Sequence, residues 1–432
     1  MRSALLALAV VGASAGSIAT AAAPAQTIVL KAAYLFDGRS DQLTRNATLV
    51  VQGDKITAVG GSQVSVPNAK VIDLGDATLL PGFMDAHTHL DSEMQPDYYR
   101  GVYELSLRFP AEQAHSAALY AKRTLEAGFT TVRNVGAADF IDVGLRNAIN
   151  AGVIPGPTML TAVHALGSTG GHCDNRPYPP AVIKPWGVIE GVCNGPEECR
   201  TAVRYQLKYG ADAIKICASG GVLSESDPVD VPQLTPAELS AIVSETHAWK
   251  RKVAAHSHGD AAAKLAVEAG VDSIEHGSFL SEATLKLMKQ KGVYLVPTRM
   301  ASYWIERQMA TYPPVIAEKA RAAAAAHTAM MKAALKIGVP IALGTDSGVS
   351  PHGMNGKEFS LLVELGMPPA AALISGTREA AKLLGVDATV GTLESGKLAD
   401  IVAVRGNVLN DISMTEKPVF VMKRGTVVVV KK

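Results

Sequence analysis

Two histidines separated by one residue, His87 and His89, are the first side chains in this sequence that could bind a metal ion. They belong to the segment PGFMDAHTHL at residues 81–90, which follows an apolar run at residues 71–80. A buried strand is expected to end here, and side chains at positions i and i+2 of a strand point to the same side. Two neutral imidazoles directed at one point are a common beginning of a zinc site.

An H-x-H pair alone occurs often by chance, so later strand ends have to support it. Four further segments each join a short apolar run to one polar residue: ADAIKICASGG, VAAHSHG, SIEHG and IALGTDSG. In this order they supply Lys215, His256, His276 and Asp346. Each follows a helix-like stretch of roughly ten to twenty residues, as is typical of β/α units. We therefore expect all these side chains to meet at one site.

The lysine in this set needs its own explanation, because an ammonium in an apolar strand is costly to bury and repels a metal cation. Burial lowers a lysine pKa, and a neutral amine reacts with carbon dioxide to give a carbamate. The two oxygens of that anion could bridge two divalent ions about 3.5–4 Å apart. Alternatively, Lys215 pairs with an acidic residue across the fold. The histidines and the aspartate at the other strand ends favour the carbamate.

The order of the candidate strands predicts the architecture. Eight of them lie near residues 82, 131, 160, 214, 254, 274, 295 and 342, with helix-like segments between them. This alternation predicts an α/β protein with a (β/α)8 TIM barrel, whose active site lies at the carboxyl ends of the strands. Residues 26–80 and 390–432 contain short alternating strands instead. We expect these ends to pair into a small discontinuous β-sandwich domain beside a barrel of residues 81–389, which includes an alanine-rich helix around residues 317–334.

These motifs, together with the late run GTLESGKLADIVAV, resemble those of the amidohydrolase superfamily of metal-dependent hydrolases. The resemblance extends from residue 28 to the C-terminus. It is most similar to the branch of Xaa-Pro dipeptidase-like enzymes and zinc carboxypeptidases that act on dipeptides and N-acyl amino acids. Bacterial amidohydrolases that cleave ochratoxin, a mycotoxin with an amide-linked phenylalanine, are also similar. The reaction implied is hydrolysis of an amide or peptide bond with release of a C-terminal amino acid.

The resemblance also implies a cofactor and its ligands. It implies two Zn²⁺ per chain, bridged by a carboxylated lysine and a hydroxide and held by His87, His89, Lys215, His256, His276 and Asp346. The H-x-H pair and Asp346 would bind one ion, and His256 and His276 the other. Asp346 would also carry the proton to the leaving amine. His258 shares a strand face with His256, and we expect it to support a ligand or to contact the substrate.

Recognition of the substrate depends on loops after the strands. Polar residues that could bind a substrate carboxylate are His164, His172, Arg176 and Arg299. The glycines and prolines of the loop after the third strand could equally form only a turn, and Arg299 could be an ordinary surface residue. Gly220 and Gly221 could bring backbone amides close to a ligand, since glycine permits close approach.

Composition and the amino terminus bear on partners and location. Lys and Arg total 41 against 40 Asp and Glu, so there is no basic excess for nucleic acid or for an acidic membrane. Arg2, the apolar run at residues 4–11 and small residues up to Ala25 predict a cleaved signal peptide and export, to the periplasm in a Gram-negative source. The run is too short to predict a membrane anchor.

The resemblance to the amidohydrolase branch also implies a homo-oligomer, with an octamer as one form.

Four cysteines fit an exported protein. Cys193 and Cys199 flank an Asn-Gly-Pro turn, where a disulfide is feasible, and their spacing is unlike that of a zinc ribbon. Cys217 lies two residues after Lys215 and is expected to be a small core residue.

Two other functions remain as alternatives. One is a mononuclear deaminase or an imidazolone-type cyclic amide hydrolase on the same fold, a group that typically lacks the lysine of the fourth strand. The presence of Lys215 counts against it. The other is a non-catalytic exported binding protein, in which loss of a ligand would be expected, and none is lost.

Overall fold

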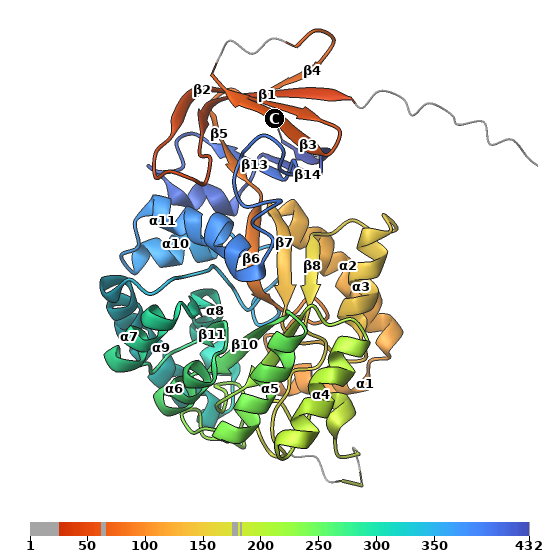
Figure 1. Cartoon of the computed structure of the whole chain (residues 1–432), viewed down its shortest axis with the longest axis vertical. Coiled ribbons are helices and arrows are strands. Elements are labelled where there is room, and N and C mark those ends of the chain that lie inside the picture. Colours follow the sequence, from red (N-terminus) through yellow and green to blue (C-terminus); the bar gives the residue numbers. More distant parts are fainter. Residues whose placement is uncertain (1–25, 62–65, 175–179, 182–183, 432) are drawn as a thin grey trace, which may run out of the picture.

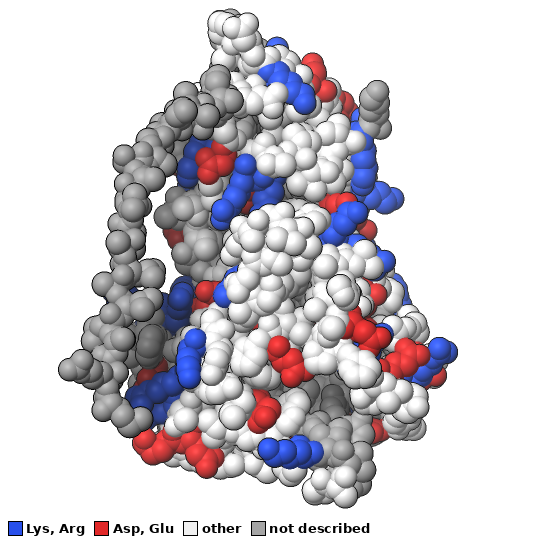
Figure 2. Space-filling view, turned by 90° about the vertical axis from the view of Figure 1, so that its right-hand side faces the viewer, with Lys and Arg blue, Asp and Glu red and all other residues white. Residues whose placement is uncertain are grey.

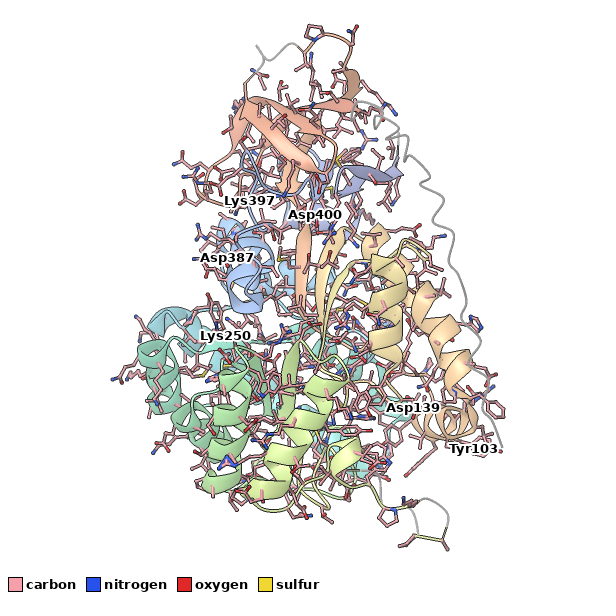
Figure 3. All side chains as sticks on the ribbon, turned by 45° about the vertical axis from the view of Figure 1, so that its right-hand side comes forward. Tyr103, Asp139, Lys250, Asp387, Lys397 and Asp400 are labelled. Carbon is pink, nitrogen blue, oxygen red and sulfur yellow. A yellow bond between two sulfur atoms is a disulfide. The ribbon has the colours of Figure 1, made fainter. Side chains whose placement is uncertain are left out.

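The computed structural model describes residues 26–61, 66–174, 180–181 and 184–431, and the expected signal peptide lies outside them. The described residues form two parts (Figure 1). A sheet built from both ends of the chain lies at the top of the view, and a larger part with parallel strands and surrounding helices lies below it. Lys397 and Asp400 lie where the two parts meet (Figure 3).

The upper part is a sheet in which the two chain ends pair. Its strands are β1 (Thr27–Leu35), β2 (Thr44–Gln52), β3 (Lys55–Gly60), β4 (Lys70–Asp73), β5 (Ala77–Pro81), β13 (Ile401–Arg405), β14 (Phe420–Lys423) and β15 (Thr426–Val430). The order is β15-β14-β13-β5-β1-β2-β3, with β4 beside β1. Leu79 of β5 pairs with Ala403 of β13, which joins the ends. The expected pairing is present, but as one eight-stranded sheet and not as two assigned layers.

The lower part contains parallel strands whose residues are almost all buried, as expected when helices cover a sheet. They are β6 (Phe83–Thr88), β7 (Phe129–Asn134), β8 (Thr158–Thr161), β9 (Ala213–Cys217), β10 (Lys252–Ser257), β11 (Ser273–His276) and β12 (Tyr294–Val296). They form two sheets, β6-β7-β8 and β12-β11-β10-β9. Each coincides with one of the eight predicted strands.

The eighth predicted strand, near residue 342, is not formed as a regular strand. Residues 340–347 lie between β12 and β6 and are bonded to both. The amide of Leu295 donates to the carbonyl of Pro340 (2.8 Å), and the amide of Ala86 donates to that of Leu343 (2.9 Å). This segment makes single bridges, Leu295 with Ile341 and Thr88 with Ser347, where a ladder was predicted. Asp346 has φ +60°, outside the extended region. A continuous, closed eight-stranded ladder is therefore not present among the described residues.

The helices cover the outside of these strands (Figure 1). They are α1 (Tyr98–Leu107), α2 (Pro110–Glu126), α3 (Ile141–Asn150), α4 (Pro196–Lys208), α5 (Pro236–Ala248), α6 (Asp260–Ala269), α7 (Glu282–Lys291), α8 (Arg299–Gln308), α9 (Pro314–Ile337), α10 (Lys357–Glu364), α11 (Pro369–Ile374) and α12 (Ala380–Leu384). The sequence marks their ends clearly: α5 begins with a Thr235–Glu238 capping box, and α9 ends at Gly338 with φ +79°.

The surface of the molecule agrees with the balanced composition. Figure 2 shows basic and acidic side chains interspersed on one face and separated by broad uncharged areas. Within the described part of the chain, no helix combines the length and the apolar character that a membrane span needs.

One buried carboxyl group gives a test of pH-dependent stability. Glu358 at the start of α10 accepts hydrogen bonds from the backbone amides of Arg299 (2.9 Å) and Met300 (2.6 Å). Burial raises the pKa of Glu358 from 4.5 to about 8. Between these values the folded protein retains a proton that the unfolded chain has lost. The contribution of Glu358 to the free energy of unfolding is therefore largest below pH 4.5, the pKa in the unfolded chain. It declines as the pH rises towards about 8, the pKa in the folded protein.

The variant Glu358→Gln keeps an uncharged acceptor and removes the titration. We expect its free energy of unfolding, measured with urea, to vary less between about pH 5 and pH 8 than that of the wild type. Equal slopes for the two proteins over this range would contradict the raised pKa.

Candidate active site

The H-x-H pair and Asp346 form one group of possible ligands. His87 is the second-last residue of β6, and His89 directly follows the strand. One carboxylate oxygen of Asp346 lies 3.4 Å from the Nε2 atoms of both histidines. The other ring nitrogens are occupied: His87 Nδ1 donates to Glu275 (2.7 Å), and His89 Nδ1 to the carbonyl of Gly136 (3.1 Å). Such bonds fix the imidazoles with Nε2 directed at a common point.

A second group lies at the ends of β10 and β11. One ligand atom from each of His256, His258 and His276 falls within 4.8 Å of the others. His276 Nδ1 hydrogen-bonds with Thr298 (2.7 Å) and His258 Nδ1 with Ser278 (2.9 Å). Burial lowers the pKa of all three imidazoles, so they are neutral, the form that binds metal. The geometry groups both His256 and His258 with His276 and does not separate the two.

The two groups are neighbours, and Lys215 faces the same cavity. The rings of His87 and His276 have centroids 4.9 Å apart. Lys215 in the middle of β9 is only 4% exposed, and within the described residues its side chain forms no hydrogen bond or ion pair. Burial lowers its pKa to about 8, although Glu275 and Asp346 oppose this shift. The alternative of a lysine paired directly with an acid is therefore not what the structure shows.

Both groups open into one cavity of about 390 Å³. Its polar lining includes His87, His89, Lys215, His256, His258, His276 and Asp346. The apolar part of its lining, here called the apolar wall, comes from α1, α8, α9 and the loop after β9, with Val102, Leu105, Leu223, Ala301, Ile305, Ala320 and Ala323. Arg108, between α1 and α2, also lines the cavity. The cavity therefore combines N and O donors with apolar surface.

Comparison with known proteins shows which family the chain belongs to. The Amidohydrolase family matches residues 78–430. The chain belongs to this family. The ochratoxinase of Aspergillus niger is 34% identical over 417 residues, covering 91% of this chain and 84% of that protein. As a family member it is a hydrolase acting on amide or peptide C–N bonds, with an α/β fold of the TIM-barrel type.

Solved structures of similar proteins include hydrolases with the same fold. A Xaa-Pro dipeptidase with bound methionine in its active site has a TM-score of 0.88 and 38% identity, covering 93% of this chain and 99% of that one. The structure of A. niger ochratoxinase has a TM-score of 0.84 and 31% identity, covering 95% and 97%. This amidohydrolase is thus similar along nearly its whole length to hydrolases of both kinds.

Two buried carboxylates of this amidohydrolase were not anticipated from its sequence. Glu275 lies between His87 and the guanidinium of Arg133 (2.8 Å). Burial opposes its charge, but Arg133 and the bond from His87 together lower the pKa of Glu275 to about 2. Asp85 accepts from the backbone amide of His87 (3.0 Å) and from the hydroxyl of Thr345 (2.6 Å). Acids inside the apolar runs FMDAHT and SIEH were the available signal.

The predicted substrate contacts divide into two sets. His172 and His258 line the cavity. Four others do not line it, namely His164, Gly220, Gly221 and Arg299, and Arg176 lies outside the described residues.

Each of the four residues away from the cavity has another role. His164 packs against Phe140, and its Nδ1 lies 3.4 Å from Gln206. Arg299 forms an ion pair with Glu306 (2.8 Å).

The two glycines provide space for their neighbours. A Cβ atom at Gly221 would lie 2.0 Å from the His172 ring, and one at Gly220 would lie 1.9 Å from the carbonyl oxygen of Pro228. In this structure the two glycines therefore allow close approach of the His172 ring and of the Pro228 carbonyl, whereas the sequence suggested close approach of a ligand.

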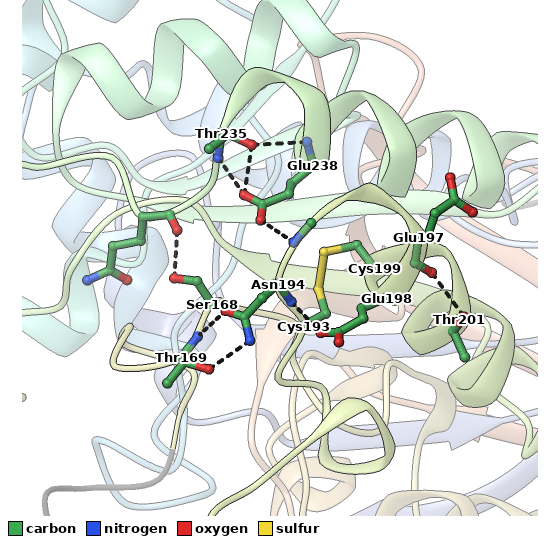
Figure 4. Close-up of a disulfide and its surroundings, with 12 residues drawn as sticks. Ser168, Thr169, Cys193, Asn194, Glu197, Glu198, Cys199, Thr201, Thr235 and Glu238 are labelled. Carbon is green, nitrogen blue, oxygen red and sulfur yellow. Dashed lines mark hydrogen bonds between the residues drawn. A yellow bond between two sulfur atoms is a disulfide. The ribbon is translucent and has the colours of Figure 1, made fainter.

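Both cysteine pairs form disulfides. The predicted Cys193–Cys199 bond is confirmed, with Cα atoms 5.1 Å apart (Figure 4). It closes the turn before α4, where the amide of Gly195 donates to Glu238 (2.7 Å). Cys217 is buried, as predicted for a small core residue, but it is also bonded to Cys173, a pairing that was not predicted. The pairing was missed because these cysteines are 44 positions apart and no motif connects them.

Proposed function

We propose that this protein is a dinuclear-zinc amidohydrolase of the carboxypeptidase or dipeptidase kind. It releases a C-terminal amino acid from dipeptides or N-acyl amino acids, and ochratoxin A is a candidate substrate. The observation that carries the proposal is that the two candidate ligand groups and the buried Lys215 line one cavity, and that no described residue forms an ion pair with this lysine. The similar proteins, an ochratoxinase and a Xaa-Pro dipeptidase, point in the same direction.

The donor set fits divalent zinc. Neutral imidazoles and a carboxylate are its ordinary ligands, and a buried ammonium among them is not. We infer that Lys215 is carboxylated: its neutral Nζ forms a bond to the carbon of CO₂ and releases a proton. His87, His89 and Asp346 would hold one ion and His256 and His276 the other, with the carbamate between them. Bound ions would polarise the scissile carbonyl and lower the pKa of the attacking water.

The remaining steps fall to side chains of the protein. Although burial opposes it, the interaction with His87 holds the pKa of Asp346 well below its usual range, so the carboxylate is ionised and can accept a proton from water. It then passes this proton to the leaving nitrogen. Arg108 and His172 are the groups in the cavity wall that we assign to the substrate carboxylate, with His258 beside them.

The apolar wall is assigned to the acyl group of the substrate. Ala320 and Ala323 lie on the buried face of α9 and line the cavity, while Ala322 lies on the exposed face. Their small side chains leave room for a large planar acyl group.

The variant Ala320→Leu fills this space. We expect kcat/KM to fall about 10–100-fold for N-aryl-acyl amino acids and to change less than about threefold for N-acetyl amino acids. Ala322→Leu on the exposed face is the matched control and should affect neither substrate. Equal losses with both substrates would place the acyl group elsewhere.

The proposed function is tested by amino acid release from N-acyl phenylalanine, proline, lysine and arginine, with metal content measured on the same preparation. We expect about two zinc ions per chain and release of the free amino acid. A fully loaded protein that releases none of them would refute the proposal.

Two structural proposals accompany this function. We infer that the two parallel sheets and residues 340–347 together make the eight-stranded barrel, since hydrogen bonds link their edges through Leu343 and, on the other side, through Leu166 and Lys215. We also infer that residues 1–25 direct export, which would expose the cysteines to an oxidising environment.

A further inference from the structure

One of the two disulfides forms part of the cavity wall. Cys173 and Cys217 both line the cavity, and their Cα atoms are 5.7 Å apart. Cys217 ends β9, two residues after Lys215, while Cys173 belongs to the loop after β8 and directly follows His172. The bond therefore ties the strand that carries the lysine to the loop that carries a cavity histidine.

The loop end held by this bond packs on one of the candidate ligand histidines. The imidazole of His172 stacks on that of His256, with centroids 4.4 Å apart and planes inclined by 24°. Its Nδ1 lies 3.4 Å from the hydroxyl of Ser224, near the outer limit of a hydrogen bond. Its backbone amide donates to Gln233 (2.8 Å). The Cys173–Cys217 disulfide is the covalent bond among these contacts, and it begins at the residue directly after His172.

The two disulfides differ in access to solvent. Cys193 and Cys199 are completely buried and do not line the cavity. A small dithiol entering the cavity therefore meets Cys173–Cys217 first. Reduction breaks the Sγ–Sγ bond, each sulfur gains one electron and one proton, and the dithiol is oxidised to its own disulfide.

We propose that Cys173–Cys217 is a positioning element of the active site, which holds His172 over the reacting groups and makes full activity depend on the oxidised state. This inference rests on the proposed function. A small displacement of a positioned group can reduce an enzymatic rate about 10²-fold. The effect on catalysis is therefore expected to exceed any effect that a disulfide has through stability alone.

The first experiment compares Cys173→Ala/Cys217→Ala with Cys193→Ala/Cys199→Ala, which removes the buried disulfide. We expect both pairs to lower Tm. Only the cavity pair should lose about 10²-fold in kcat/KM at 25 °C, with zinc content unchanged. In the cavity pair, residues 164–174 should also exchange amide hydrogen faster, whereas the control pair should leave their exchange as in the wild type. Unchanged kcat/KM and unchanged exchange in the cavity pair would overturn the inference.

The second experiment reduces the wild type with dithiothreitol and counts thiols by mass spectrometry. Activity should fall as Cys173 and Cys217 become free and should return on reoxidation with oxidised glutathione. Loss of activity in the reduced wild type but not in the alanine pair would mean that free thiols capture metal, which also overturns the inference. Oxidised, zinc-loaded wild type that hydrolyses no substrate would refute the proposed function, while the exchange measurement still decides whether the disulfide positions the loop.

Discussion

Lys215→Ala is expected to lose both bound metal and hydrolysis. The carbamate that we assign to Lys215 would be the anion shared by the two metal positions, so its removal leaves cationic ions among neutral imidazoles. Metal polarisation contributes several kcal/mol to a hydrolytic transition state, so kcat/KM should fall about 10³-fold or more. Zinc per chain, measured after dialysis, should fall in the same preparation.

The structural reason is the isolation of this lysine. Its side chain is 4% exposed and lacks a hydrogen bond or ion pair within the described residues, although Glu275 lies close enough to influence its pKa. Glu275 is already bonded to His87 and Arg133. A buried, unpaired ammonium is costly, and conversion to an anion between two cations removes that cost.

Two additions make this experiment specific. Bicarbonate with a short carboxylate such as acetate should partly restore activity to Lys215→Ala, because a free carboxylate can occupy the place of the carbamate. Lys286→Ala, which removes an exposed lysine of α7, should leave zinc and activity unchanged. Full turnover by Lys215→Ala without such additives would remove the carbamate from the mechanism.

The candidate ligands could be located in the sequence because each lies in or just after an apolar run. This pattern located β6, β9, β10 and β11, with Lys215 in the middle of β9 and the histidines near the ends of the other three strands. It failed for the last strand, where residues 340–347 make only single bridges and Asp346, which lines the cavity, has a positive φ. Strand periodicity indicates which face a residue occupies, but it gives no information on such a local departure from extended backbone.

Neighbours across the fold were harder to predict. Side-chain hydrogen bonds between strands, such as that of His87 with Glu275, join residues as far as 188 positions apart in the sequence. The alanine-rich segment predicted a helix, but not that Ala320 and Ala323 would border the cavity. Alanine fits any face of a helix, so its pattern does not indicate a packing partner. The Cys173–Cys217 bond depends in the same way on a proximity that only the folded chain reveals.

Asp346→Asn is the second substitution with a large expected effect. Asparagine keeps the shape and one accepting oxygen but cannot accept a proton. General acid–base catalysis contributes about 10²–10⁴-fold, so kcat should fall by that factor when zinc is saturating. Asp139→Asn is the control, since that aspartate is exposed and separate from the cavity lining (Figure 3).

The pH–rate profile separates the proton-transfer role of Asp346 from simple loss of a ligand. The carboxylate acts as a base only when ionised, and interactions with His87, His89 and His276 hold its pKa well below the usual range despite burial. In the wild type, kcat should therefore remain high until strongly acidic pH and then decline as Asp346 takes up a proton. Asp346→Asn at saturating zinc should lack this acidic decline. A variant with wild-type kcat would show that another group carries the proton, and one that loses zinc but recovers full kcat on zinc addition would show that Asp346 serves only as a ligand.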